Sequence, residues 1–561
     1  MRRTLIQLAP RYRTVLSCTL AAAAMLAWQT TTSSQAPSFD FVIRGGHVID
    51  GTGNPWFSAD VGIKGDTIAA VAPHLDATGA RVIDATGRVV APGFIDVHSH
   101  ADAGNTAVPA GTADPLVRDD KQDLVGNPAA ENDVRQGVTT VIAGPDGFGT
   151  TEVGAYLAKV AAAKPAINLA AFIGHGAVRK AVIGMTNRLA TPEELDRMRQ
   201  LVRTGMREGA VGMSTGLFYV PANYAPTGEV IELARVAGEF GGFHQSHMRD
   251  EASHLVDSVR ETIAIGEQGG LPTQVTHHKG IGKAAWGRSV ETLRLIDEAR
   301  ARGVDATVDL YPYTASNTTI QAALIPQWAQ EGGRDAMLAR FKDETTRQRI
   351  LNEISSLILN ERGGGDPANV VLASCGFDAS LAGKSLADIL RDRRRPVTID
   401  QASDVVMEIV EKGSCVGIYH AISEDDLVRI MKHPATMIAS DASPGMPTFG
   451  KDAPHPRAYG TFARVLGVYV REKHVLTLEE AVRKMTSFPA QRAGLEDRGV
   501  LRPGMKADVV VFDPATIIDK ATFEKPHQYA EGVAAVLVNG RLTLSDGAMT
   551  GERAGRALKR Q

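Results

Sequence analysis

Short runs of hydrophobic residues alternate with longer amphipathic segments through most of the chain. Helices between the runs begin at capping sequences such as Thr191-Pro192-Glu193-Glu194, which precedes an apolar stripe at helical spacing. Eight of the hydrophobic runs have the character of buried strands, and they end at His98, Gly144, Gly174, Gly216, His247, His278, Tyr311 and Asp441. Eight repeats of strand and helix predict an α/β fold, a parallel (β/α)8 barrel of the TIM type.

The two ends of the chain have a different pattern, with short strands separated by turns. Segments 61–64 and 68–71 flank the turn at Gly65-Asp66, and segments 508–512 and 533–538 have the same character. Neither end supplies enough apolar residues for a core of its own. We therefore expect a small β-sandwich domain built from both chain ends.

These patterns divide the chain into a signal peptide, a barrel and a β domain. We place the β domain at 38–91 and 491–548 and the barrel at 92–490. The segment from about 315 to 434 is too long for one crossover and predicts an insertion over the barrel mouth. Insertions at that end of a barrel shape the substrate pocket.

The first residues are typical of a secretory signal peptide. Arginines at 2, 3, 11 and 13 precede an apolar run at 14–28, and a polar segment follows. We predict a signal peptide over 1–36 and an exported protein, periplasmic or secreted; an uncleaved membrane anchor is the alternative. No later segment has the roughly 20 consecutive apolar residues of a membrane span. Cys375 and Cys415 would remain after cleavage, and the sequence does not decide whether they pair.

Composition excludes some classes of function. The 561 residues carry a formal net charge of -3, and 22% of them are charged, which is ordinary for a soluble enzyme. The chain lacks the excess of basic residues that is typical of nucleic-acid-binding proteins. The function must therefore be argued from sites, and the oligomeric state stays open.

Histidines and carboxylates gather where the predicted strands end. His98 and His100 are two residues apart on a strand, so both imidazoles point to one face and can bind one metal ion. The same end of the barrel would carry His247, His277 and Asp441, with Asp146 in the loop after the second strand. Barrel active sites are built at that end. Nitrogen and carboxylate ligands suit zinc, with manganese or iron as alternatives.

A hydrolytic metal centre needs a water molecule and a group that moves its proton. The metal lowers the pKa of bound water to about 7 and polarises a carbonyl. A neighbouring carboxylate can take the proton and pass it to the leaving nitrogen. Asp441 is the candidate for this role, and a plain metal ligand is the alternative.

Several motifs occur in an order that resembles a known family. They are Pro92-Gly93-Phe94-Ile95-Asp96-Val97-His98-Ser99-His100, His247-Met248-Arg249-Asp250-Glu251, Thr276-His277-His278-Lys279, Ser440-Asp441 and His455-Pro456-Arg457-Ala458-Tyr459. They resemble the amidohydrolase superfamily, specifically the N-acyl-D-amino-acid deacylases (D-aminoacylases). The resemblance implies one or two zinc ions, with His247 and His277 at a tight position and His98, His100 and Asp441 at a weaker one. It also implies that Arg457 binds the substrate α-carboxylate and that Tyr311, His175 and Asn317 line the substrate site.

Two positions depart from that family. Asp146 stands where the family has cysteine, and Asn317 stands where it tends to have serine. A carboxylate can still bridge metals, but it is a harder ligand than thiolate, so manganese would bind relatively better. The fourth strand ends Met213-Ser214-Thr215-Gly216 and has no lysine to bridge two metals. We therefore expect Asp146, His247 and His277 to hold the occupied position.

The predicted reaction is hydrolysis of the amide bond of an N-acyl-D-amino acid. Metal-bound hydroxide would attack the acyl carbonyl, and Asp441 would return the proton to nitrogen. A cyclic amide (hydantoin-like) or dipeptide hydrolase is the second hypothesis. The third is a non-catalytic exported binding protein, and the competent residue at every expected position argues against it.

Overall fold

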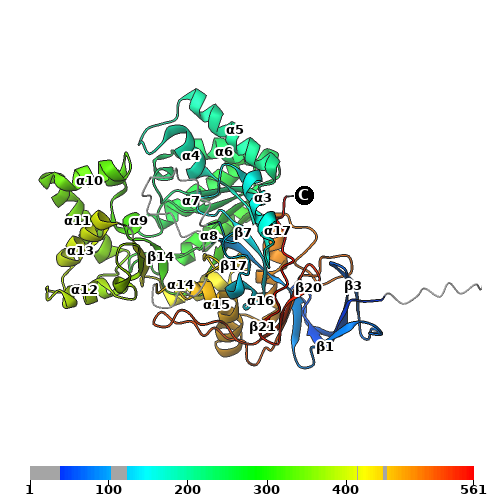
Figure 1. Ribbon diagram of the computed structural model, residues 1–561. Helices are drawn as coiled ribbons and strands as arrows, with labels where there is room; N and C mark the ends of the chain where they lie inside the picture. Colours follow the sequence, from blue (N-terminus) through cyan, green and yellow to red (C-terminus); the bar gives the residue numbers. More distant parts are fainter. Residues whose placement is uncertain (1–37, 103–122, 414, 446–451, 561) are drawn as a thin grey trace, which may run out of the picture.

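The computed structural model describes residues 38–102, 123–413, 415–445 and 452–560, so the predicted signal peptide lies outside the described residues. A ring of parallel strands forms the centre of the molecule (Figure 1). Its members are β6 (Phe94–Ser99), β7 (Val138–Ala143), β8 (Asn168–Ala171) continued by β9 (Ile173–Gly174), β10 (Gly212–Gly216), β11 (Phe243–His247), β12 (Thr273–Val275), β13 (Ala306–Leu310) and β17 (Thr436–Ile438). A bridge between Ser99 and Ala442 joins the last strand to the first. The predicted barrel is confirmed.

Helices cover the outside of the barrel. They are α3 (Val153–Ala163), α4 (His175–Ile183), α5 (Pro192–Glu208), α6 (Thr227–Glu239), α7 (Leu255–Gly269), α8 (Ser289–Ala301), α14 (Glu424–Lys432), α16 (Leu478–Met485) and α17 (Ser487–Ala493). Helix α5 begins with the predicted capping box, in which Thr191 and Glu194 bond each other's backbone N–H groups. Its apolar stripe is buried at Met198, Val202 and Met206.

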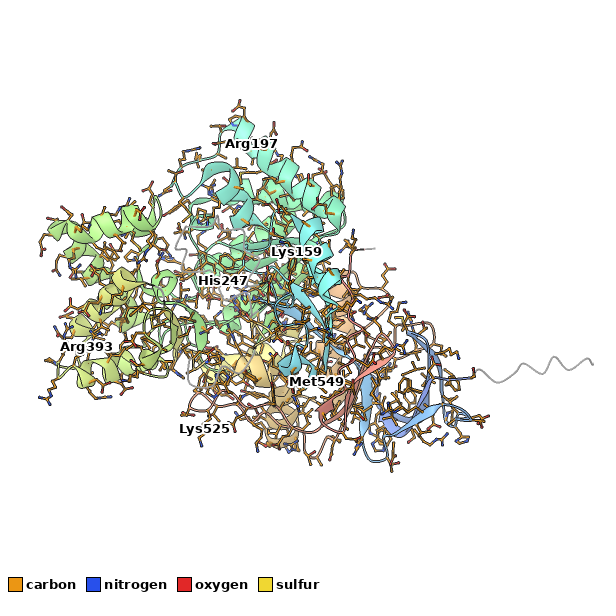
Figure 2. The ribbon with its side chains drawn as sticks, in the orientation of Figure 1. Lys159, Arg197, His247, Arg393, Lys525 and Met549 are labelled. Atoms are coloured by element: carbon orange, nitrogen blue, oxygen red, sulfur yellow. A yellow bond between two sulfur atoms is a disulfide. The ribbon has the colours of Figure 1, made fainter. Side chains whose placement is uncertain are left out.

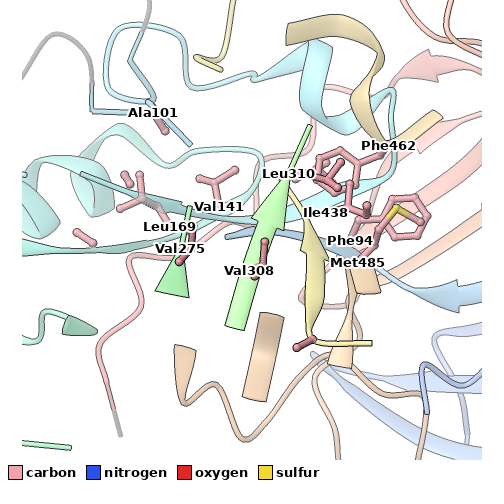
Figure 3. Packing of buried hydrophobic residues seen from close by; sticks show 14 of the residues in the cluster. Phe94, Ala101, Val141, Leu169, Val275, Val308, Leu310, Ile438, Phe462 and Met485 are labelled. Carbon is pink, nitrogen blue, oxygen red and sulfur yellow. The ribbon is translucent and has the colours of Figure 1, made fainter. Parts of the chain in front are cut away.

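Several barrel strands contribute apolar side chains to two separate clusters. Phe94, Val141, Leu169 and Ile438 lie in the cluster between strands and helices, shown in Figure 3. Their chain neighbours at 95, 142, 170 and 437 lie in a second cluster. Since successive side chains of a strand point to opposite faces, the second cluster fills the barrel interior. The barrel is thus a packed support for whatever lies at its mouth.

Strands from both chain ends form one nine-stranded sheet beside the barrel. Its strands are β1 (Phe41–Val48), β2 (Phe57–Lys64), β3 (Thr67–Ala72), β4 (Arg81–Asp84), β5 (Val89–Pro92), β18 (Val509–Phe512), β19 (Val533–Val538), β20 (Arg541–Ser545) and β21 (Ala548–Met549). The two ends meet where β5 pairs antiparallel with β18. Side chains from both ends, such as Val61 and Leu537, share one hydrophobic core.

An inserted layer with its own core lies on the opposite side of the barrel from the small β domain (Figures 1 and 2, where Arg393 marks the layer). It contains the antiparallel strands β14 (Ser316–Thr319), β16 (Cys415–Tyr419) and β15 (Val370–Cys375) and the helices α9 (Ile320–Leu324), α10 (Arg334–Lys342), α11 (Glu344–Asn360), α12 (Leu386–Asp392) and α13 (Ile399–Lys412). A disulfide joins Cys375 to Cys415. Helix α14 packs Leu427, Ile430 and Met431 into the barrel core, so the layer ends before Glu424 rather than at 434.

The remaining helical elements are short connections. They are α2 (Glu131–Val134), α15 (Arg457–Arg464), the π-helix Val465–Glu472, and 3-10 turns at Ala222–Tyr224, Gln327–Gln330, Pro367–Asn369 and Ala379–Leu381. Within the described ranges, no helix combines the length and the apolar character that a membrane crossing requires.

Candidate metal centre

The six predicted ligands converge at the mouth of the barrel. Their ligand atoms form two groups in which all members lie within 4.8 Å of one another. The groups are His98, His100, Asp146 and Asp441, and Asp146, His247 and His277. All six side chains are buried. Figure 2 places His247 near the middle of the molecule, between the barrel helices and the inserted layer.

Asp146 lies between the two groups. Its Oδ1 is 3.6 Å from Nε2 of both His98 and His277. Its Oδ2 is 3.5 Å from His100 Nε2 and 3.7 Å from His247 Nδ1. Each oxygen therefore faces one histidine of each group, so Asp146 could contribute a ligand atom to either group.

Asp441 faces both the metal ligands and an arginine. Its Oδ1 is 3.3 Å from His98 Nε2 and 3.1 Å from His100 Nε2. Its Oδ2 lies 2.7 Å from Arg457 Nη1, an ion pair without hydrogen-bond geometry. Burial alone would raise the pKa of Asp441, but Arg457 and His98 outweigh it and hold the pKa well below its usual range. The carboxylate is ionised and able to accept a proton.

Three of the ligands have left-handed backbone conformations. The φ angles are 56° at Asp146, 35° at His277 and 53° at Asp441. Residues other than glycine rarely adopt positive φ, and such strain gathers at functional sites. Two predicted strand ends were too late in the chain. Strand β12 ends at Val275 rather than at His278, and strand β17 ends at Ile438 rather than at Asp441.

A second layer of polar groups supports the histidines. Glu251 Oε1 lies 3.1 Å from His277 Nδ1, and Oε2 lies 3.7 Å from His247 Nε2. Lys279 Nζ donates to Glu251 at 2.5 Å. Burial would raise the pKa of Glu251, but Lys279 and His247 outweigh it and keep the carboxyl ionised. Carboxylates behind metal-binding histidines fix the ring orientation and strengthen the nitrogen as a ligand.

His98 has a support of its own. Its Nδ1 lies 2.5 Å from the Thr276 hydroxyl, which donates to Asp309 Oδ2 at 2.7 Å. The other oxygen of Asp309 accepts the backbone N–H of His277 at 2.7 Å. One buried carboxylate therefore positions a histidine of each group.

The arrangement fits a zinc ion. Among the described residues, His98 Nε2 and Asp146 Oδ1 are buried without a hydrogen-bond partner. Buried polar atoms are normally satisfied, so these orphan atoms indicate a ligand. Imidazole nitrogens and carboxylate oxygens are common zinc donors.

Comparison with known proteins identifies the family of the chain. A family model described as the amidohydrolase family matches residues 81–544. The chain belongs to the amidohydrolase family. The D-aminoacylase of Alcaligenes xylosoxydans xylosoxydans is 36% identical, over 94% of this chain and 99% of that protein. The resemblance predicted from the motifs is confirmed, and the protein is a hydrolase.

Solved structures agree over nearly the whole amidohydrolase chain. A D-aminoacylase studied for its binuclear metal center has a TM-score of 0.75 and 36% identity, covering 93% of this chain and all (100%) of that one. An N-acyl-D-glutamate deacylase from Bordetella bronchiseptica, complexed with zinc and a phosphonate mimic of the tetrahedral intermediate, has a TM-score of 0.74 and 35% identity, with the same 93% and 100% coverage. The arrangement of the ligand atoms and the similarity to metal-containing relatives therefore both support metal binding at this centre.

Two of the predicted substrate residues of this amidohydrolase, Arg457 and Asn317, line a cavity with the metal ligand Asp441. Ser374 and Val416 of the inserted layer line the same cavity. Asn317 donates to the Gly417 carbonyl at 2.9 Å.

Tyr311 lies against the same arginine. The Arg457 guanidinium is 4.6 Å from the centre of the Tyr311 ring. The Tyr311 hydroxyl is buried without a hydrogen-bond partner among the described residues. Burial raises its pKa well above the usual value, so it is available as a neutral donor.

His175 lies at the start of α4, and its role in the substrate site stays a prediction. It is fully buried, and its Nε2 lies 3.4 Å from Glu229 Oε1, which also pairs with Arg179. It begins α4, and Ala177 N–H in that first turn donates to Gly147 O at 3.0 Å. The first turn of α4, which His175 begins, therefore contacts the turn that carries Asp146 through Ala177.

Sequence reasoning missed part of the polar network. The motifs that contain Lys279 and Glu251 do not by themselves indicate a role for either residue. Both are buried, and both contact His277. The sequence signals are faint: Glu251 is four residues after His247, and Lys279 is two residues after His277.

Proposed function

We propose that this amidohydrolase removes the acyl group from N-acyl-D-amino acids. The observation that carries the proposal is the Asp441–Arg457 pair at 2.7 Å, inside a buried centre of metal ligands. It places a proton acceptor beside a guanidinium that can bind an α-carboxylate. The D-aminoacylase and N-acyl-D-glutamate deacylase relatives support this substrate class.

The chain's own groups divide the work of hydrolysis. The planar fork of Arg457 takes the α-carboxylate, with the Tyr311 hydroxyl beside it as a further donor. Asp441 accepts a proton from the attacking water and returns it to the amide nitrogen as the carbon–nitrogen bond breaks. Water is consumed, and a carboxylic acid and a free D-amino acid are released. A zinc ion held by the histidines and Asp146 would polarise the acyl carbonyl and lower the pKa of water.

The substrate class is tested by the products of matched substrates: free amine from N-acyl amino acids and dipeptides, and the ring-opened N-carbamoyl amino acid from hydantoins. Zinc-loaded protein is given N-acetyl-D-amino acids, their L enantiomers, hydantoins and dipeptides. We expect amine from the D substrates only. Hydantoins lack a free α-carboxylate for Arg457, so turnover of hydantoins alone would favour the cyclic-amide hypothesis. Absence of amine from every D substrate would refute the proposal.

We also propose that the protein is exported to the periplasm or beyond. The basic and apolar pattern of 1–36 and the Cys375–Cys415 disulfide support this, because disulfides persist in oxidising compartments. Mass spectrometry of protein recovered from cell fractions gives the test. A mature N-terminus near residue 37 in the periplasm or medium is expected, and an intact N-terminus in the cytoplasm would overturn the proposal.

A further inference from the structure

Arg362 is a buried cation that the reaction described above does not use. It follows α11 in the inserted layer and is 4% exposed. The only carboxylate oxygen of the described residues within 4.0 Å of it is Glu251 Oε2, at 3.9 Å. Its Nη1 reaches Ser316 Oγ only at 3.5 Å, and its Nε is buried without a hydrogen-bond partner in the described part of the chain.

The other buried arginines among the described residues have much closer partners. Each has a carboxylate oxygen at 2.7 Å or less: Arg179 with Glu229, Arg457 with Asp441, Arg492 with Asp305 and Arg498 with Asp508. Glu251 cannot supply the same for Arg362, because Lys279 holds it at 2.5 Å and two cations share one negative charge. Burying an incompletely paired charge is costly. Among the described residues, Arg362 therefore has room for a closer anionic partner.

The guanidinium of Arg362 faces the active site. It lies 4.8 Å from the centre of the Phe218 ring, which stacks on His247 with centroids 5.5 Å apart. Glu251, its closest carboxylate, also contacts His277. Only one aromatic ring separates Arg362 from a metal-ligating histidine, so a substrate at the metal centre lies within reach of it.

We propose that Arg362 binds a second carboxylate on the substrate, in addition to the α-carboxylate that Arg457 binds. This inference rests on the proposed function and deepens it. The second carboxylate belongs either to an acidic side chain, as in an N-acyl-D-glutamate, or to a dicarboxylic acyl group, as in an N-succinyl-D-amino acid. Arginine suits the task because it stays charged when buried and binds carboxylate through two parallel hydrogen bonds.

The test compares each acidic substrate with a neutral partner of similar shape. N-acetyl-D-glutamate is paired with N-acetyl-D-glutamine, and N-succinyl-D-alanine with N-butyryl-D-alanine. The wild-type protein should prefer the acidic member of one pair, which identifies the source of the carboxylate. Arg362→Gln should lower kcat/KM for that substrate by about 100-fold and for its neutral partner by less than about threefold, because a buried charge-assisted pair is lost. Arg362→Lys should recover part of the loss.

Arg347→Gln is the matched control, since Arg347 lies on α11 but pairs with Glu411 near the surface. It should leave both members of each pair unchanged, and thermal unfolding should show that all variants are folded. A wild-type preference for neutral substrates, or an equal loss on both members in Arg362→Gln, would overturn the inference while leaving deacylation intact. If no N-acyl-D-amino acid is hydrolysed, the proposed function and this inference fail together.

Discussion

The two halves of the metal centre share Asp146 but differ in what surrounds them. His247 and His277 are supported by Glu251, whose negative charge is held in place by Lys279. In the other half, the carboxylate beside His98 and His100 is Asp441, and the second oxygen of Asp441 forms an ion pair with Arg457. The difference indicates two tasks. One half is arranged to hold a metal ion firmly, and the other to move a proton beside a bound carboxylate.

Electrostatics explains why the halves would bind metal unequally. An ionised carboxylate behind an imidazole increases the electron density that the ring offers to a cation. A guanidinium at 2.7 Å from Asp441 does the opposite, because it competes with the cation for the same negative charge. We therefore assign the tighter position to Asp146, His247 and His277, and the weaker one to His98, His100 and Asp441.

The largest expected effect comes from Asp441→Asn. Asparagine tolerates the left-handed backbone at this position but cannot accept the proton. We expect kcat to fall by about 1,000-fold, within the range for loss of a general base. Elemental analysis should still find one zinc per chain, because the tight position does not depend on Asp441. Loss of that zinc would show that the halves are not separate, and the exposed Asp425→Asn on α14 serves as the control.

Arg457→Gln should separate substrate binding from metal binding. Loss of a charge-assisted contact to the α-carboxylate should lower kcat/KM by about 100-fold, chiefly through KM. At the same time Asp441 is released from its cationic partner, so the second metal should bind several-fold more tightly, by roughly 1 kcal/mol. Metal titration of the zinc-loaded variant measures this gain. Unchanged affinity for the second ion would contradict the competition between Arg457 and metal.

The sequence allowed the barrel and the ligands to be predicted because their signals are local. His98, His247 and the residues after β12 and β17 follow hydrophobic runs, and the carboxyl ends of parallel strands meet at one place. Arg362 and Glu251 could not be placed in this way, because their partners come from distant parts of the chain. The buried pair of His175 with Glu229 could not be placed from the motif either, because Glu229 lies 54 residues further along the chain.

Glu251→Gln tests the support behind the tight position. The amide keeps the shape of the side chain but removes its charge, so His247 and His277 lose their negative partner. Zinc affinity should fall by about 10- to 100-fold, as for other residues behind metal ligands. Competition with a chelator that reports free zinc gives the measurement without reference to turnover. The same change at Glu267, exposed on α7, should leave the affinity unaltered.

The smallest predicted effect concerns metal choice and uses Asp146→Cys. Thiolate is a softer ligand than carboxylate, so the ratio of zinc to manganese affinity should rise by about tenfold. The backbone opposes the change slightly, because φ at Asp146 is 56° and aspartate adopts this conformation more readily than cysteine. A small drop in thermal stability of the metal-free variant is therefore expected together with the gain in zinc selectivity. If the ratio stayed the same while the stability fell, Asp146 would be a structural turn residue, and the two halves would not share a bridging ligand.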